Sequence, residues 1–335
     1  MKIIKIEDVE KYTDEEIKRF FDRVVVIPTE TVYGLAGRID NDDILKDIYK
    51  IKGRPSNNPL ILHVSDLDML KTVIDGEISL KYKKLIERFW PGPLSLIFKA
   101  NKNLSNVVRG SSMETVAVRM PLNKMLLRII SIVGVPLAAP SANISGRPSP
   151  TEINHVVNDF GDDIETYIDG GPCKFGLEST VFMELDGINY ILRPGSVTKE
   201  DIEKAVNEPV ILKTKADGSK IVSPGTKYTH YSPKVPVFLF VGEKYLENFK
   251  KEANTFKNKK IGIMIQNKDI SKIEIENAIL FDLGDTKEKS ASRCFQGLRE
   301  LENKVDVIFI KGFDTTNEGA AIMDRLEKAS VKIIK

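Results

Sequence analysis

Short apolar runs alternate with segments of helical periodicity along the first 210 residues. The apolar runs are rich in Val, Ile and Leu, which is typical of buried strands, whereas the helical segments place an apolar residue at every third or fourth position. We predict strands at 24–27, 60–64, 94–98, 115–118, 180–183 and 190–192, and helices at 42–51, 80–89, 123–133 and 152–159. This order predicts an α/β domain built on a twisted, mixed sheet.

Strands and helices alternate more regularly toward the C-terminus. We predict strands at 237–241, 260–265, 278–281 and 305–310, and helices at 244–257, 287–302 and 318–327. A strand–helix–strand rhythm of this kind is typical of a parallel sheet with right-handed crossovers. The C-terminal part is therefore predicted to be a small Rossmann-like parallel α/β domain.

The segment between these two patterns is polar and rich in residues that interrupt regular structure. Pro224, Gly225 and Pro233 prevent a continuous helix or strand, so the segment is predicted to be an extended linker. It also contains aromatic side chains such as Tyr231, which plain linkers lack, so we expect it to pack against another part of the chain. We therefore predict three parts, namely a first domain at 1–210, a linker at 211–235 and a second domain at 236–335.

Composition and charge narrow the function classes. The 335 residues are 41% hydrophobic and 29% charged, so the chain can bury more than one core. The net charge is only +2, and residues 1–210 carry 27 Lys and Arg against 31 Asp and Glu, a net −4, so bulk coating of nucleic acid is not implied. Two cysteines and three dispersed histidines exclude a disulfide scaffold, a multi-thiolate zinc site and a His-based metal cage.

The chain also carries no sign of a membrane location. No apolar run reaches the roughly 18 residues that a membrane-spanning helix needs, and residues 1–6 lack the apolar core of a signal peptide. We therefore expect a cytoplasmic protein.

Candidate chemistry gathers in polar, backbone-bending segments at strand ends, where ligands of α/β sheets usually bind. The common nucleotide-binding and nucleophile-elbow motifs are absent. Four of the 13 arginines lie next to a proline or are separated from one by a single residue, and an Arg fork on a rigid backbone suits phosphate or carboxylate. These arginines are Arg54, Arg119, Arg147 and Arg193. Together with nearby Ser and Thr hydroxyls, they predict a site for an anionic, phosphate-bearing small molecule without a protein nucleophile.

Single residues of this set also have simpler interpretations. An Arg-Pro pair is most often a surface turn. His63 on an apolar strand is more often a core histidine than a catalyst, and Glu30 can be a helix cap or a surface charge. Trp90 and the following Pro-Gly-Pro can form a rigid turn around a buried indole, and Cys173 can be a small loop residue. The functional hypothesis therefore rests on the co-occurrence of the segments.

The first 200 residues closely resemble the YrdC-like domain of threonylcarbamoyl-adenylate synthases. The segments that carry the resemblance are 28–35, 52–55 with 58–60, 90–93, 118–121, and 140–143 with 145–146. The segment 230–233 and the C-terminal α/β pattern are similar to the longer, two-domain form of that family. The resemblance implies condensation of L-threonine, bicarbonate or CO2, and ATP to threonylcarbamoyl-AMP and pyrophosphate. The aromatic content of the linker, with Tyr231 in a segment bracketed by prolines, leads to the further hypothesis that the linker closes over the active site as a lid.

The resemblance also implies partners and site residues. ATP would be a substrate that brings Mg²⁺, and a tRNA-modifying threonylcarbamoyl transferase complex would act downstream. Lys52 and Arg54 would face the phosphates as catalytic residues. The threonine site would comprise Thr31, His63, Arg119, Ala139 and Ser179, with the Arg119 fork on the substrate carboxylate. The ATP site would comprise Arg54, Asn58, Thr115, Ser141, Asn143, Ser149, Arg193 and Tyr231. No metal ligand is assigned, and direct contact with tRNA is left open.

Two other functions are weighed against this one. An enzyme that forms carbamoyl-adenylate shares the domain, but such proteins carry Cys-x-x-Cys zinc modules that this chain lacks. A non-catalytic RNA-binding module would use the arginines as a cationic surface, but the net charge of residues 1–210 is negative. Substrate dependence distinguishes the first alternative, and binding of bare tRNA distinguishes the second.

Overall fold

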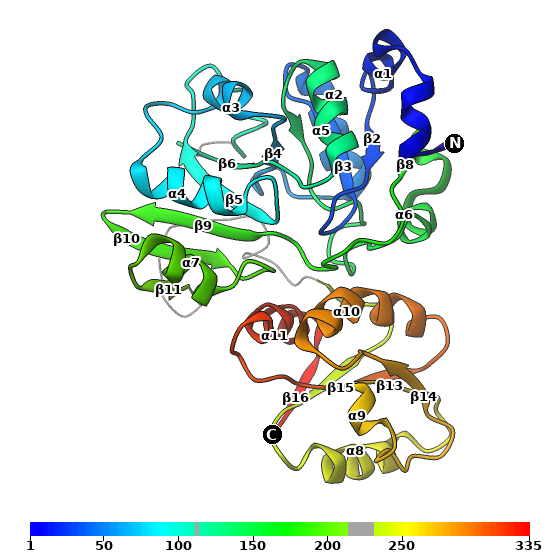
Figure 1. Cartoon of the computed structure of the whole chain (residues 1–335). Coiled ribbons are helices and arrows are strands. Elements are labelled where there is room, and N and C mark those ends of the chain that lie inside the picture. Colours follow the sequence, from blue (N-terminus) through cyan, green and yellow to red (C-terminus); the bar gives the residue numbers. More distant parts are fainter. Residues whose placement is uncertain (111–113, 214–230) are drawn as a thin grey trace. The chain divides into compact units, whose positions relative to one another are not determined.

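The computed structural model describes residues 1–110, 114–213 and 231–335 (Figure 1). The described residues form two compact units. The second unit contains residues 146–149, 175–177 and 231–335, and the first unit contains the rest. Two short segments from the first 210 residues therefore belong to the second unit.

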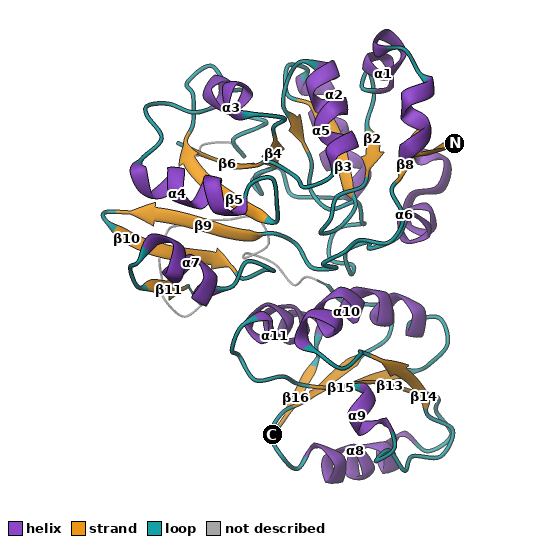
Figure 2. Ribbon diagram, viewed as in Figure 1, coloured by secondary structure: helices purple, strands orange, loops and turns teal. Residues whose placement is uncertain are grey.

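The first unit is built on an eleven-stranded mixed sheet (Figure 2). Its strands are, in spatial order, β1 (Lys2–Lys5), β8 (Thr166–Asp169), β2 (Val25–Ile27), β3 (Gly34–Arg38), β7 (Leu137–Ala138), β4 (Ile61–His63), β6 (Thr115–Arg119), β5 (Leu94–Lys99), β9 (Thr180–Leu185), β10 (Ile188–Arg193) and β11 (Val210–Leu212). Parallel and antiparallel pairs alternate across the centre, because β4 is parallel to β6 whereas β5 is antiparallel to it. The predicted mixed sheet is confirmed.

The helices of the first unit pack with the sheet in two separate cores. The helices of the first unit are α1 (Asp14–Phe20), α2 (Asp42–Lys52), α3 (Leu67–Val73), α4 (Leu80–Phe89), α5 (Lys124–Val133), α6 (Ile153–Phe160) and α7 (Lys199–Val206), with 3-10 turns at η1 (Ile6–Lys11) and η2 (Gly161–Asp163). Ile17 of α1 and Leu126 of α5 pack with Val25 of β2 in one core. Leu45 of α2 and Leu85 of α4 belong to a larger core with strands β4 to β6.

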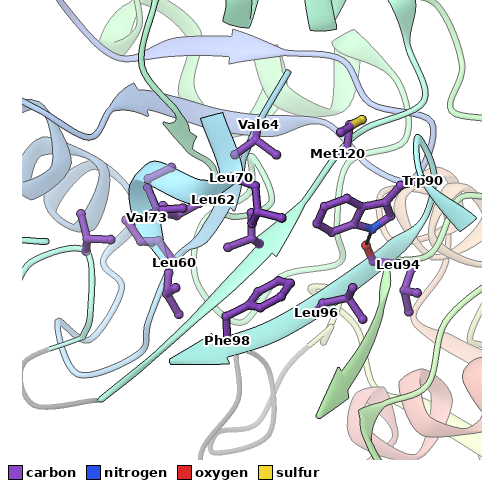
Figure 3. Close-up of a cluster of buried hydrophobic side chains, with 14 of the residues drawn as sticks. Leu60, Leu62, Val64, Leu70, Val73, Trp90, Leu94, Leu96, Phe98 and Met120 are labelled. Carbon is purple, nitrogen blue, oxygen red and sulfur yellow. Dashed lines mark hydrogen bonds between the residues drawn. The ribbon is translucent and has the colours of Figure 1, made fainter. Parts of the chain in front are cut away.

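Side-chain alternation assigns the central strands a core face and an opposite face. Successive residues of a strand point to opposite sides of the sheet. The helix-covered side carries Leu60, Leu62 and Val64 around β4, and Leu94, Leu96 and Phe98 on β5, together with Leu70 of α3 (Figure 3). The opposite side of the same strands carries a separate small cluster, composed of Ile61, Ile97, Ala117, Val181 and Leu192. No helix of the first unit's described residues contributes to that cluster.

The second unit is a five-stranded parallel sheet with helices on both sides (Figure 1). Its strands are, in spatial order, β14 (Ile279–Asp282), β13 (Ile261–Ile265), β15 (Val307–Lys311), β12 (Val237–Phe240) and β16 (Lys332–Ile334). Its helices are α8 (Tyr245–Ala253), η4 (Asn254–Phe256), α9 (Asn267–Ile270), α10 (Lys287–Leu301) and α11 (Glu318–Ala329). Helices α10 and α11 lie together on one side, and α8 and α9 lie on the other. The predicted parallel C-terminal fold is confirmed.

The structure differs from the sequence prediction at several boundaries. The predicted helix 244–257 ends at Ala253 and continues as a 3-10 turn. Strand β11 includes residues 211 and 212, which were predicted as the start of the linker, and residues 214–230 of that linker lie outside the described residues. Among the described residues, the helices are too short or too polar to cross a membrane.

Candidate active site

Two predicted site residues, His63 and Arg119, lie on strands β4 and β6, and Ser95 lies on the adjoining strand β5. His63 follows Ile61 by two positions, Arg119 follows Ala117 by two, and Ser95 precedes Ile97 by two. Because strands alternate with a period of two, these polar side chains share the face of the Ile61 cluster. The strand pairing also places His63 directly opposite Arg119. A polar site is therefore built beside a small apolar patch.

Arg119 is the centre of this site. It is 3% exposed, and its guanidinium donates from Nε to the Gly92 carbonyl (3.1 Å), from Nη1 to Thr31 Oγ1 (2.9 Å) and from Nη2 to Glu30 Oε1 (2.5 Å). The other oxygen of Glu30 accepts from the backbone N–H of Leu122 at 3.0 Å. A buried charge is tolerated only when it is paired and hydrogen-bonded, and Glu30 supplies that pairing.

The segment 29–32, which includes the Arg119 partners Glu30 and Thr31, is a tight turn held by its own hydrogen bonds. Thr29 Oγ1 lies 2.8 Å from Thr31 Oγ1, donates to the Val32 carbonyl at 2.7 Å, and accepts from the backbone N–H groups of Thr31 and Val32. Side-chain bonds of this kind replace the strand ladder after β2 and hold the backbone in a bend. They fix Thr31 with its hydroxyl toward Arg119.

His63 is a buried histidine with an unusual environment. It is 4% exposed, and its Nδ1 atom has no hydrogen-bond partner among the described residues. Burial lowers the pKa of His63 to about 3, and the positive charge of Arg119 acts in the same direction. The imidazole is therefore neutral at physiological pH. A buried nitrogen without a partner departs from the satisfied core histidine that the simpler interpretation of His63 expected.

Ser179 and Arg193 form a second hydrogen-bonded group. Arg193 donates to the Ser179 carbonyl from Nε (3.1 Å) and Nη2 (2.9 Å), and Nη2 also lies 3.0 Å from Ser179 Oγ. Ser179 Oγ in turn lies 2.8 Å from Ser95 Oγ on β5. All three side chains are buried. Arg193 therefore orients the backbone and the hydroxyl of Ser179.

The turn at 90–93 lies between the Arg119 group and the Ser179 group. The Gly92 carbonyl accepts from Arg119, and the adjacent Pro93 carbonyl accepts from the N–H of Thr180 at 3.0 Å. A Cβ atom at Gly92 would lie 2.3 Å from the Phe89 carbonyl oxygen, so only glycine fits there. The Trp90 indole is buried and donates to the Leu94 carbonyl, which confirms the predicted rigid turn around a buried indole.

Lys52 organises a third group. It is the last residue of α2, is 2% exposed, and its Nζ donates to the backbone carbonyls of Ser141 and Asn143. Ser141 Oγ donates to Asn143 Oδ1 at 2.6 Å. The same loop pairs with the start of β3, where Ala142 N–H donates to the Tyr33 carbonyl at 2.7 Å. The loop that contains Ser141 and Asn143 is called the Lys52 loop, because Lys52 binds its carbonyls. It is therefore hydrogen-bonded to Tyr33, two residues after Thr31.

Arg54 and Asn58 shape the neighbouring loop after α2. Arg54 donates from Nε to the Asn58 carbonyl (3.2 Å) and from Nη2 to the Pro59 carbonyl (2.9 Å). Asn58 itself is buried, and its carbonyl also accepts from the Tyr49 hydroxyl at 3.2 Å. Arg54 therefore closes its own loop in this structure and is half-buried beside it.

The remaining predicted residues are distributed over both units. Ala139 is buried and its N–H donates to the Ile61 carbonyl at 3.0 Å, whereas Thr115 is half-buried at the start of β6. Ser149 and Tyr231 belong to the second unit. Tyr231 is 5% exposed there, and its ring packs on Phe295 with 5.1 Å between the centroids.

Two members of the site were missed by sequence reasoning. Glu30 is neither a helix cap nor a surface charge, because it is buried and paired with Arg119. The signal that could have revealed it is the position of Glu30 between two threonines of the turn. Ser95 is not among the predicted site residues, although it is the one polar residue of the apolar run at 94–98.

Comparisons with known proteins identify the family. A family model described as telomere recombination matches residues 21–195, and one described as the C-terminal domain of threonylcarbamoyl-AMP synthase matches residues 197–331. The threonylcarbamoyl-AMP synthase of Pyrococcus abyssi is 39% identical over 93% of this chain and 92% of its own length. The threonylcarbamoyl-AMP synthase of Bacillus subtilis is 39% identical over 92% of this chain and 90% of its own length.

The chain belongs to the threonylcarbamoyl-AMP synthase family. The crystal structure of P. abyssi Sua5 complexed with L-threonine superimposes with a TM-score of 0.88 at 35% identity, covering 100% of this chain and 99% of that one. The resemblance to this family is thus confirmed over both units. A threonylcarbamoyl-AMP synthase is an enzyme that makes an adenylate, so its reaction is a nucleotidyl transfer with ATP as substrate.

Proposed function

We propose that this synthase condenses L-threonine, bicarbonate or CO2, and ATP to threonylcarbamoyl-AMP and pyrophosphate, for transfer to a tRNA adenosine by a downstream enzyme complex. The family membership supports the adenylate product. The observation that carries the assignment of substrates to this site is the buried Arg119 group beside neutral His63. His63 and Arg119 are paired across β4 and β6, on the face of these strands that carries the Ile61 cluster.

The threonine subsite is assigned to Thr31, His63, Arg119, Ala139 and Ser179. Arg119 uses three N–H groups on Glu30, Thr31 and Gly92, and a guanidinium has five. The remaining donors suit a substrate carboxylate, as a planar fork binds it well. His63 is uncharged and adds hydrogen-bonding capacity without repelling the substrate ammonium or amine.

The ATP subsite is assigned to the groups organised by Lys52 and Arg193. Lys52 and Arg54 would act on the phosphates as catalytic residues, because fixed cations stabilise the charge that develops when the α-phosphate is attacked. The other residues assigned to ATP are Asn58, Thr115, Ser141, Asn143, Ser149, Arg193 and Tyr231. Both nucleophiles of the reaction, the threonine amine and its N-carboxylate, belong to substrates. The chain therefore needs to position components and neutralise charge, which proximity and electrostatics supply.

Mg²⁺ is proposed to enter with the triphosphate. Among the described residues, no three His, Cys, Asp or Glu side chains cluster in a way that could hold a metal ion. The donors around Lys52 are an ammonium group and backbone carbonyls, which do not make a carboxylate site. The described residues therefore do not form a protein magnesium site, and we assign no step to the ion.

The domain boundaries and the linker lid remain predictions. The predicted parts are 1–210, 211–235 and 236–335, and most of the linker lies outside the described residues. Truncation before Ser223 tests the lid: turnover of ATP to pyrophosphate should fall, and unchanged turnover would remove the lid from the proposal.

Threonine-dependent release of pyrophosphate tests the proposed function directly. Wild type should release pyrophosphate only when threonine, bicarbonate and ATP are all present. Arg119→Ala should lower that rate by roughly a hundredfold to a thousandfold, because the carboxylate loses its charged partner. Arg128→Ala is the matched control, since Arg128 is half-exposed on α5 and pairs only with Glu10 among the described residues. Release that needs carbamoyl phosphate in place of threonine and bicarbonate would favour the carbamoyl-adenylate alternative instead.

A further inference from the structure

The segment 146–149 follows the Lys52 loop directly but belongs to the second unit. It contains Ser149, which the proposed function places in the ATP subsite. Ser149 is fully buried. Because the segment 146–149 is grouped with the C-terminal part of the chain, residues of that part hold its backbone in place. Two residues at the C-terminal end of α10 make these contacts.

Arg299 of α10 is the first of these residues. It is 5% exposed and donates twice to the Pro148 carbonyl, from Nε at 3.1 Å and from Nη2 at 2.5 Å. Two donors on one carbonyl fix both its position and its direction. The Pro148 carbonyl belongs to the peptide unit that leads into Ser149. Arg299 therefore sets the backbone immediately before the residue assigned to ATP.

Glu302, at the C-terminal end of α10, is the second. Its side chain is 3% exposed and one carboxylate oxygen pairs with Arg147. The other oxygen accepts from the backbone N–H of Lys234 at 2.9 Å. The N–H of Ser232 donates to the Gly146 carbonyl at 2.8 Å. The segment 146–149 is thus held at both of its ends, by Arg299 near Ser149 and by Glu302 near Gly146.

Helix α10 also packs against a second short segment, residues 175–177. Gly176 has φ +69°, and a Cβ atom there would lie 2.3 Å from the Ser292 carbonyl oxygen and 2.5 Å from Ser292 Cα. The backbone of the segment 175–177 therefore packs directly on α10, and no side chain fits between them. This segment precedes Ser179, which is assigned to the threonine subsite.

We propose that α10 is a positioning element for the substrate loops, and that Arg299 and Glu302 are positioning residues for ATP. The inference rests on the proposed function, because it takes Ser149 to be part of the ATP subsite. A loop whose backbone is already fixed pays less ordering entropy when the ligand binds. The contribution of these two residues therefore lies mainly in ATP affinity. This gives the C-terminal unit a role in catalysis without a residue of α10 touching a substrate.

Four variants of α10 test the proposal in pairs. Glu302→Gln removes the ion pair with Arg147, and its matched control is Glu300→Gln, whose carboxylate faces Gln296 and Lys304 instead. Arg299→Lys removes the double contact with Pro148. Its control is Arg293→Lys, because Arg293 also donates from α10 to a backbone carbonyl, that of Asp282 at 2.6 Å. The measurements are KM for ATP, kcat and the thermal unfolding midpoint.

The proposal predicts that the KM for ATP rises about tenfold in Glu302→Gln and Arg299→Lys, whereas kcat changes less, as expected for the loss of a charge-assisted contact. The two controls should keep the wild-type KM. Adding Arg147→Ala to Glu302→Gln should raise the KM for ATP no further, because both changes break the same ion pair between Arg147 and Glu302. A purely structural role would lower the unfolding midpoint and leave KM unchanged.

Specific results would overturn the proposal. A KM for ATP that stays at the wild-type value in Glu302→Gln, or that rises equally in Glu300→Gln, would do so. If Arg299→Lys does not fold, Glu302→Gln decides alone, because Gln keeps the size and the hydrogen bond to Lys234. Wild type that releases no pyrophosphate in response to threonine would instead remove the proposed function, so the two failures are distinguishable.

Discussion

The two faces of strands β4, β5 and β6 bury different kinds of side chain, although the residues concerned are neighbours in the sequence. The helix-covered face is apolar throughout and includes Leu62 and Leu96, which are fully buried (Figure 3). The opposite face places His63, Ser95 and Arg119 beside a small apolar cluster, and these residues are also buried. One face therefore buries hydrocarbon, and the other buries polar groups that must satisfy one another.

The comparison shows where stability and function separate in one sheet. Burial of leucine lowers the free energy of folding without any directional requirement. Burial of Arg119 is tolerated because Glu30 and Thr31 are held in place for it. Burial of the polar face therefore costs desolvation free energy, and such a cost is expected at binding sites.

Glu30→Gln should have the largest effect, because it leaves the Arg119 charge buried without its anionic partner. Loss of one partner of a buried ion pair typically costs about 3–5 kcal/mol of unfolding free energy. The KM for threonine should also rise by about tenfold, because the Arg119 fork loses the contact that orients it. Urea unfolding and threonine-dependent pyrophosphate release measure the two effects. A stable variant with wild-type KM would show that Glu30 does not support the polar face.

Leu96→Ala should affect stability and leave the site intact. Leu96 lies on the other face of β5, next in sequence to Ser95, and is fully buried. Truncation of a core leucine costs about 2–5 kcal/mol, because apolar contacts are lost and a cavity forms. Below the unfolding transition, kcat and both KM values should match wild type. A raised KM for threonine in the folded variant would contradict the separation of the two faces.

The apolar pattern predicted most of the central fold. Strands β4, β5 and β6 were found from their Val, Ile and Leu runs, and their residues are buried on both faces as such runs indicate. Strand β7 has only two residues and β3 contains two glycines, so neither resembles a strand locally. The pairing of β1 with β8 joins residues far apart in the sequence, which a local pattern cannot reveal.

The site was predicted only in part, for a related reason. Residue types and motifs indicated Arg119 and Thr31, and the structure places these two in contact. The same motif contains Glu30, but a sequence does not show which way a side chain in a turn points, so the pairing with Arg119 was missed. The assignment of Ser149 to a segment held by α10 depends on contacts across about 150 residues of sequence, which only folding brings together.

His63 gives the smallest effect and the most specific one. In the unfolded chain the pKa of His63 is 6.5, and in the folded chain it is lowered to about 3. Burial is the larger cause, and the positive charge of Arg119 lowers the pKa further. Because the folded pKa is depressed, the unfolded state binds more protons below pH 6.5, so stability is present above that pH and falls as the pH decreases toward 3. The expected loss between about pH 7 and about pH 5 is about 2 kcal/mol of unfolding free energy.

His63→Gln isolates this contribution, because an amide does not titrate and the other ionisable groups are unchanged. Urea unfolding at the two pH values should show a smaller loss for the variant than for wild type, by about 2 kcal/mol. Leu62→Ala, one residue away on the apolar face, should be less stable than wild type by a similar amount at both pH values. An equal pH dependence in wild type and His63→Gln would mean that His63 takes up its proton in the folded state. The polar face would then be open to water, and it would differ from the helix-covered face in solvent access as well as in composition.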